Sequence, residues 1–135
     1  MTTIETLCPC GSNQNYTECC QPFHDGTHFP ITAEALMRSR YSAYVLQNAD
    51  YLLATWHKTT RPKQLDFSKD NTTWQKLEIL HTKKGGAKDD KGRVEFNAYM
   101  LDGEMRLMMH EISRFKKIAG RWFYVDSLSC LFGRG

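Results

Sequence analysis

The sequence predicts an α+β protein in which N-terminal helices pack on a curved antiparallel sheet, after a small cysteine-rich segment. Three observations support this prediction. Four of the five cysteines lie in "CPCGSNQNYTECC", residues 8–20. Apolar residues recur at helical spacing between 32 and 56, and from residue 73 onward apolar and polar residues alternate as they do in strands. A chain of 135 residues is long enough for one core and a small appendage.

The cysteines of this segment form two close pairs, Cys8 with Cys10 and Cys19 with Cys20. Disulfides between neighbouring cysteines are strained, and crossed disulfides need an oxidising compartment. A reactive redox pair is typically CxxC, which is not the spacing here. Four thiolates presented as two close pairs are a typical tetrahedral zinc site, and such a closed site is structural. The pattern therefore favours a structural zinc ion, with His24 as an alternative fourth ligand.

The residues between the two pairs suit a compact metal-binding loop. Pro9 fixes its own backbone angle, and Gly11 permits a sharp turn. Ser12 and Asn13 are expected to cap a short helical turn. Tyr16 is expected to pack its ring over the loop.

Two helices are predicted after the cysteine segment. Thr32 is the expected N-cap of the first, and "QNAD" ends that helix. Asp50 is the expected cap of a second helix from Tyr51 to about Trp56, and residues 58–72 read as a loop. The apolar residues at helical spacing in the first helix are Leu36, Met37, Tyr41, Tyr44 and Val45.

About four strands are predicted from residue 73 onward, joined as a meander by turns such as Asp102-Gly103. Strict alternation sets Trp74 on the opposite face from Leu77. The inward residues expected in the second strand are Val94, Phe96, Ala98 and Met100. The residues expected to share one face of the third strand are Met105, Leu107, Met109, Glu111, Ser113 and Phe115. The last strand is "RWFYVDSLSCLF", in which Cys130 is expected to be buried.

Composition and charge exclude several classes of protein. No apolar run approaches the roughly 20 residues of a membrane span, and the N-terminus does not read as a signal peptide, so we expect a cytoplasmic protein. Residues 61–135 carry fifteen Lys/Arg against ten Asp/Glu. Because the lysines of "KKGGAKDDKGR" are interleaved with acids, a solvated surface is favoured, with an acidic partner as the alternative. Glu18 is the only charge of the cysteine segment, so we expect no direct nucleic-acid binding through it.

Three residues are weak catalytic candidates: Glu111, His57 and Arg38. "HEIS" is not a metalloprotease motif, because a strand places His110 and Glu111 on opposite faces. Glu111 is expected on the apolar face, where a carboxylate needs a partner such as Arg38 or Arg40. A buried ion pair that docks the helix is favoured, and a general base is the alternative. His57 is expected to be a hydrogen-bonded residue near a helix end.

The cysteine segment resembles the SEC-C motif, a zinc knuckle found at the C-terminus of the SecA translocation ATPase and in many bacterial proteins. Both cysteine pairs and the residues Pro9, Gly11, Ser12 and Tyr16 stand where the motif has them. The last ligand is a histidine in SecA, and here Cys20 takes that place. The resemblance implies that zinc is bound by Cys8, Cys10, Cys19 and Cys20.

The segments "LMRSRYSAYVLQNADYLLATWH" and "HEISRFKKIAGRWFYVDS" resemble the YchJ family, an uncharacterised UPF0225-type family. The resemblance implies an NTF2-like cone at residues 29–135 after a zinc knuckle at residues 1–28. We expect a non-enzymatic protein-interaction module that also has the capacity to form a homodimer. By analogy with SecA, the partner is a protein such as a chaperone, or the ribosome. The alternative is a small-molecule-binding protein or enzyme that uses the cone's pocket.

Overall fold

A computed structural model describes residues 6–134, so the first five residues of the expected knuckle and Gly135 lie outside the description. The helices are α1 (Gln21–His24), α2 (Ala33–Val45) and α3 (Ala49–Ala54), and a 3-10 turn spans Tyr16–Glu18. The strands are β1 (Thr72–Lys84), β2 (Lys91–Asp102), β3 (Met105–Ile118) and β4 (Arg121–Arg134). They form one antiparallel sheet in the order β1-β2-β3-β4, which confirms the predicted α+β meander.

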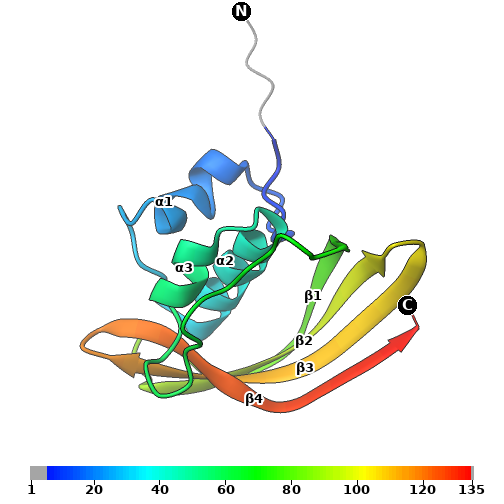
Figure 1. The fold of residues 1–135 in the computed structure, drawn as a ribbon. Coiled ribbons are helices and arrows are strands. Elements are labelled where there is room, and N and C mark those ends of the chain that lie inside the picture. The colour runs from blue at the N-terminus through cyan, green and yellow to red at the C-terminus, as the bar shows by residue number, and fades with distance from the viewer. Residues whose placement is uncertain (1–5, 135) are drawn as a thin grey trace, which may run out of the picture.

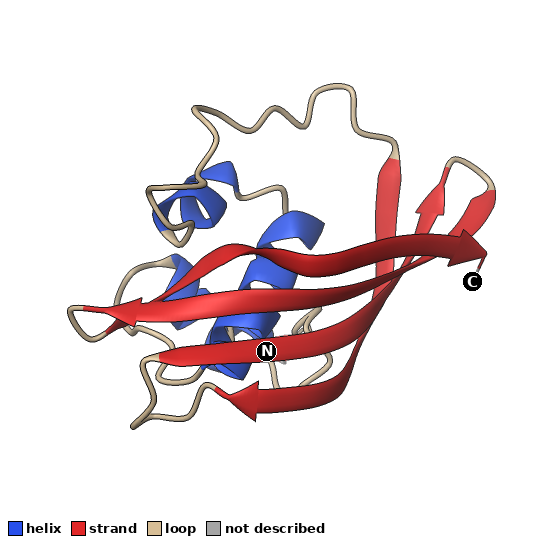
Figure 2. Ribbon diagram, turned by 90° about the horizontal axis from the view of Figure 1, so that it is seen from below, coloured by secondary structure: helices blue, strands red, loops and turns tan. Residues whose placement is uncertain are grey.

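The helices cover one face of the sheet. The sheet curves around α2 and α3, and the cysteine segment lies above these helices (Figure 1). Figure 2 views the molecule from below, where the strands lie in front of the helices. The second face of the sheet is therefore left uncovered by helices. In the described part of the chain, no helix is long and apolar enough to cross a membrane.

The helices α2 and α3 each begin at a residue whose side chain caps the helix. The Thr32 hydroxyl accepts a hydrogen bond from the Ala35 N–H at 3.0 Å, as predicted. The predicted cap of α3 is wrong, because the Asn48 side chain, and not Asp50, accepts the Tyr51 N–H at 3.1 Å. Asp50 instead lies in the first turn, where its negative charge interacts favourably with the positive end of the helix dipole.

Strict alternation fails in β1 because the strand carries two irregularities. The pairing with β2 shifts between Trp74 and Lys76 and again between Ile79 and His81. A bulge adds one residue and reverses which face the following side chains occupy. Trp74 therefore packs against the same core as Leu77, and not on the opposite face as predicted.

The core lies between α2 and the concave face of the sheet. Its buried members include Leu36, Met37, Tyr41, Leu77, Val94, Phe96, Phe115 and Trp122, and the predicted inward residues of β2 are all buried. Two glycines at one end of the sheet, Gly85 and Gly92, lie against each other and against the start of α2. A Cβ built on Gly92 would lie 2.5 Å from the Gly85 Cα and 3.2 Å from the Ala33 Cβ. These glycines let the helix start against the end of the sheet.

Candidate metal centre

The four cysteines of the N-terminal segment meet at one point. Cys8 and Cys10 lie before the 3-10 turn, and Cys19 and Cys20 lie between it and α1. The Gly11 backbone has a φ of 83°, a left-handed conformation that bends the chain back on itself. Every Sγ atom of the four lies within 4.8 Å of the other three. Local chain geometry alone thus gathers four potential metal ligands.

The sulfur spacing fits tetrahedral coordination. The Sγ atoms of Cys10 and Cys19 are 3.6 Å apart, and those of Cys19 and Cys20 are 3.9 Å apart. Four thiolates at about 2.3 Å from one zinc ion would be separated by about 3.8 Å. All five cysteines of the chain fall within the described residues, and none is in a disulfide. The cluster therefore has the donor atoms and spacing of a site that could hold a metal ion.

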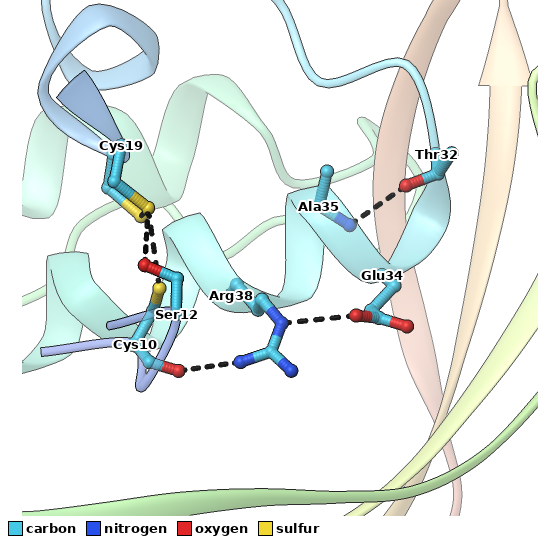
Figure 3. Close-up of polar contacts among 8 residues, drawn as sticks. Cys10, Ser12, Cys19, Thr32, Glu34, Ala35 and Arg38 are labelled. Atoms are coloured by element: carbon cyan, nitrogen blue, oxygen red, sulfur yellow. Dashed lines mark hydrogen bonds and ion pairs between the residues drawn. The ribbon is translucent and has the colours of Figure 1, made fainter. Parts of the chain in front are cut away.

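Ser12 contacts the sulfur cluster directly. Its hydroxyl lies 3.1 Å from the Cys19 Sγ (Figure 3). The predicted role of Ser12 and Asn13 as helix caps is wrong, because the 3-10 turn begins after Asn15 without a side-chain cap. A hydroxyl beside a thiolate is a donor that stabilises negative charge on sulfur. The prediction for Tyr16 is confirmed, since its ring packs against the cysteines.

Without a cation, the thiols share negative charge unequally. Hydrogen bonding from Cys20 lowers the pKa of the Cys10 thiol to about 4. The same hydrogen bond, together with burial, raises the pKa of Cys20, and burial raises the pKa of Cys19 to about 11. One thiolate is thus held by protonated neighbours. A bound cation is what would allow all four to ionise together.

His24 is not positioned as an alternative ligand. Its Nε2 lies 2.8 Å from the Ser39 carbonyl oxygen, which only accepts, so Nε2 carries the proton. Its Nδ1 then accepts from the Tyr16 hydroxyl at 2.6 Å. Both ring nitrogens are used, and burial lowers the pKa of His24, which favours the neutral ring. The ring also packs on Tyr51 at 4.6 Å, so His24 joins the cysteine segment to the helices.

Two residues of α2, Arg38 and Ser42, form hydrogen bonds to the cysteine cluster. The Arg38 guanidinium donates to the Cys10 carbonyl oxygen at 2.7 Å (Figure 3). The Ser42 hydroxyl donates to the Cys20 Sγ at 3.3 Å and lies 3.4 Å from the Cys8 Sγ. Sequence reasoning missed these roles, although the spacing of four residues already placed Arg38 and Ser42 on one helix face.

Glu111 lines a separate cavity of about 250 Å³ between α2 and the sheet. It accepts a hydrogen bond from Ser113, on the same strand. The prediction of an ion pair between Glu111 and an arginine is wrong, because no such pair forms among the described residues. Arg38 pairs with Glu34 at 3.1 Å, and Arg40 donates to the Leu52 carbonyl oxygen at 2.8 Å.

Arg40 lines the same cavity as Glu111, but its guanidinium contacts aromatic rings, the Leu52 carbonyl and the Thr55 hydroxyl and forms no ion pair with that carboxylate. Its guanidinium carbon lies 5.0 Å from the Trp56 ring centre and 4.7 Å from that of Tyr124. The side chain is buried, and this burial lowers its pKa. Cation–π contacts and the α3 carbonyl thus replace the expected carboxylate partner.

The three catalytic candidates are not brought together. His57 is buried, and its Nδ1 accepts from the Thr59 N–H at 3.1 Å, as expected for a hydrogen-bonded residue after a helix. Neither His57 nor Arg38 lines the cavity that contains Glu111. The expectation of a buried Cys130 is also wrong. This thiol is exposed, because the end of edge strand β4 extends beyond the helices (Figure 1).

Two families match this chain. The family described as "YchJ, middle NTF2-like domain" matches residues 32–127, and the SEC-C motif matches residues 6–22. The chain belongs to the YchJ family. These matches confirm the expected combination of a SEC-C motif and an NTF2-like fold, while the exact boundary between residues 28 and 29 stays a prediction.

Curated relatives and solved structures agree with this assignment. A UPF0225 protein of Streptomyces coelicolor is 48% identical over 119 residues, covering 88% of this chain and 92% of the relative. A UPF0225 protein of Serratia proteamaculans is 44% identical over 134 residues, covering 95% of this chain and 86% of the relative. The solution structure of a SEC-C motif containing protein from Rhodopseudomonas palustris is similar with a TM-score of 0.80 and 33% identity, covering 90% of this chain and 97% of that chain. A crystal structure of a SEC-C motif containing protein from Psychrobacter arcticus is similar with a TM-score of 0.73 and 30% identity, covering 88% of this chain and 80% of that chain.

Proposed function

We propose that this YchJ-family protein is a cytoplasmic protein-interaction module whose SEC-C knuckle is built around one structural zinc ion. The four converging thiols carry this proposal. Tetrahedral sulfur sites are typical of zinc or iron–sulfur centres, and a single ion at this spacing favours zinc. Four thiolates fill the tetrahedron and leave no position for a substrate, so the metal would stabilise the fold and not act in catalysis.

The residues that would hold zinc are Cys8, Cys10, Cys19 and Cys20, and the ion would supply positive charge that keeps all four ionised. The chain's own residues then fix the knuckle on the body. Arg38 and Ser42 support it from α2. His24 links it to both α2 and α3. The knuckle is thus held as a rigid surface beside the NTF2-like body.

The surface beside the knuckle fits a protein partner. A groove of about 350 Å³ is lined by residues between 23 and 30, by α3 and its ends, and by the start of β4. Aromatic residues contribute much of its lining; Phe29 of that lining is 47% exposed, and the nearby Ile31 is 71% exposed. Exposed apolar side chains gathered beside a groove are typical of protein-binding surfaces. We call this surface the junction groove, and its aromatic lining residues are Phe23, Phe29, Tyr51, Trp122 and Phe123.

A small-molecule function is the second candidate, because Glu111 lies in a cavity with largely aromatic walls. Its volume of about 250 Å³ is below the roughly 300–1,000 Å³ of drug-sized ligand pockets. Arg40 lines this cavity with Glu111, but the other two catalytic candidates, His57 and Arg38, do not. The interaction module is therefore the better supported function.

Affinity purification with quantitative mass spectrometry tests the interaction function. Tagged wild-type protein is compared with Cys19→Ser, which removes one ligand, and with Cys130→Ser, a matched cysteine change outside the cluster. We expect the same partner proteins with the wild type and Cys130→Ser, and their loss with Cys19→Ser. Identical partners for all three proteins would contradict a zinc-dependent interaction surface.

A further inference from the structure

A shallow groove of about 380 Å³ at one end of the sheet is strongly basic. Six of its nine lining residues are Lys or Arg, and none is acidic. Arg93 alternates along β2 with the buried Val94, so its side chain is on the face that the helices leave uncovered (Figure 2). We call this surface the basic face. Its cations, all exposed, are Lys83, Lys84, Lys91, Arg93, Arg114 and Lys116.

The strand register sets like charges directly opposite one another. Arg93 is opposite Lys83 on β1 and opposite Arg114 on β3, and Lys91 is opposite Lys116. Like charges in directly opposed positions destabilise a sheet. The row continues to one acid on β4, since Arg114 forms an ion pair with Asp126 at 2.5 Å. Three repulsive cross-strand pairs in one place are an arrangement that stability alone does not favour.

The acids that are interleaved in the sequence do not neutralise this face. The Asp89 carboxylate accepts from the Gly86 N–H at 2.9 Å, within the turn between β1 and β2. Neither Asp89 nor Asp90 lines the groove. The sequence therefore favoured an ordinary solvated surface, but in the folded chain these acids do not line the groove.

We propose that the basic face binds an acidic, extended segment of a partner protein, in which Asp or Glu recurs at every second position. Arg93 and Lys91 are two residues apart on one strand, as are Arg114 and Lys116, which separates each pair by about 6.8 Å. Alternate side chains of an extended peptide have the same spacing. This inference rests on the proposed interaction function and names its partner's chemistry. Phe123 of the junction groove is opposite Lys116, so the two surfaces adjoin.

Two other occupants are less well matched. Single-stranded nucleic acid is bound through aromatic stacking as well as charge, but Phe115, the aromatic residue of this lining, is only 1% exposed. A second copy of the chain, docked symmetrically through the same face, would set cations against cations. An acidic protein segment satisfies the charge and needs no aromatic platform.

Fluorescence anisotropy tests this proposal on the zinc-loaded full chain. The probe is a fluorescein-labelled peptide of five Glu-Ser repeats, titrated at about 50 and about 200 mM salt. We expect saturable binding that weakens with salt. Arg93→Glu combined with Lys116→Glu should weaken it about tenfold or more. The control is Lys58→Glu with Lys63→Glu, an equal charge change at exposed residues of another surface, which should retain most of the binding.

Thermal unfolding separates loss of binding from loss of folding. Arg93→Glu alone replaces two repulsive pairs, with Lys83 and Arg114, by two attractive ones. We expect its melting temperature to rise by about 2 to 4 °C while peptide binding falls. A variant that is more stable and binds less tightly identifies the basic face as functional.

Three results would overturn the proposal: no binding of the peptide to the wild type, equal loss of binding in the Lys58/Lys63 control, or tighter binding of an oligothymidine of equal charge. The last result would assign the face to nucleic acid. Cys19→Ser separates this inference from the proposed function, because no lining residue of the basic groove lies in the cysteine segment, so we expect this variant to bind the peptide as the wild type does. Absence of zinc from the wild type with retained peptide binding would remove the zinc function alone.

Discussion

At the scale of single residues, Arg38 connects the knuckle to the body. It donates to the Cys10 carbonyl oxygen at 2.7 Å and pairs with Glu34 at 3.1 Å on its own helix. The hydrogen bond to Cys10 crosses 28 positions of sequence, whereas the pair with Glu34 is local. Hydrogen bonds from a charged donor are stronger than neutral ones, so the first contact carries most of the docking.

Arg38→Met should loosen the knuckle, because the Cys10 carbonyl loses its charged donor at a cost of about 1.5–3 kcal/mol. Amide hydrogen exchange should accelerate in residues 7–24, and zinc should be removed by a chelator at lower concentration. Glu34→Gln is the matched control, since it removes the ion pair and leaves the hydrogen bond to Cys10. Equal effects of the two changes would show that the docking contact is not specific.

At the scale of elements, caps and glycines place the helices on the sheet. Asn48 caps α3, and Asp50 is only a charge in its first turn. The start of α2 lies against the Gly85 and Gly92 backbones, and the Ala33 N–H donates to the Gly85 carbonyl oxygen at 2.8 Å. These local contacts determine where α2 meets the knuckle.

Asn48→Ala should lower the free energy of unfolding by about 1 kcal/mol, because the Tyr51 N–H loses its acceptor. Asp50→Asn should have a smaller effect, since it removes only a favourable charge near the helix start. Urea unfolding of both variants measures the difference. A larger loss in Asp50→Asn would show that the cap had been assigned to the wrong residue.

Gly92→Ala should be strongly destabilising, by about 2 kcal/mol or more, because its Cβ would lie 2.5 Å from the Gly85 Cα. Backbone, and not a flexible side chain, is what would have to move. Gly133→Ala is the control, because nothing lies within 4 Å of a Cβ at that position. Chemical denaturation of both proteins tests the claim, and similar midpoints would contradict it.

At the scale of the whole molecule, the knuckle and the body have separate cores. The cysteines and Tyr16 form one cluster, while the main core lies between α2 and the sheet. Polar contacts between the two parts run through Arg38, Ser39 and Ser42, and aromatic contacts run through His24 and Phe23 onto the helices. Because the main core includes none of the knuckle's residues, the body should keep its fold when the knuckle is lost.

Zinc chelation, or Cys19→Ala, should disorder the chain up to about residue 22 and leave the sheet intact. Amide exchange and near-UV circular dichroism measure this, with Cys130→Ala as the matched control. Protection should disappear in the knuckle and persist in β2 and β3. Unfolding of the whole chain on chelation would show that the knuckle is part of the main core.

Sequence reasoning succeeded where structure is determined locally. The spacing of Cys8, Cys10, Cys19 and Cys20 within one short loop predicted their convergence. Alternation in β3 likewise placed Glu111 on the inner face. The partners of Glu111 were not predictable, because the orientation of Arg40 depends on where α3 places the Leu52 carbonyl.

Other errors also came from features beyond local pattern. The β1 bulges reversed the face of Trp74, since alternation does not show where an extra residue is inserted. The acids of the turn before β2 masked the basic face, because sequence alone does not show that Arg93 and Arg114 pair in the sheet while those acids stay out of the groove. Cross-strand register, and not composition, revealed that surface.

Whether the four clustered cysteines bind zinc is decided by the metal content of freshly purified protein, measured by mass spectrometry together with a free-thiol count on the same sample. We expect one zinc ion per chain and one readily titrated thiol, the exposed Cys130. Five reactive thiols without metal, or two disulfides without metal, would contradict the zinc knuckle. The function of the cysteine segment would then have to be sought in redox chemistry.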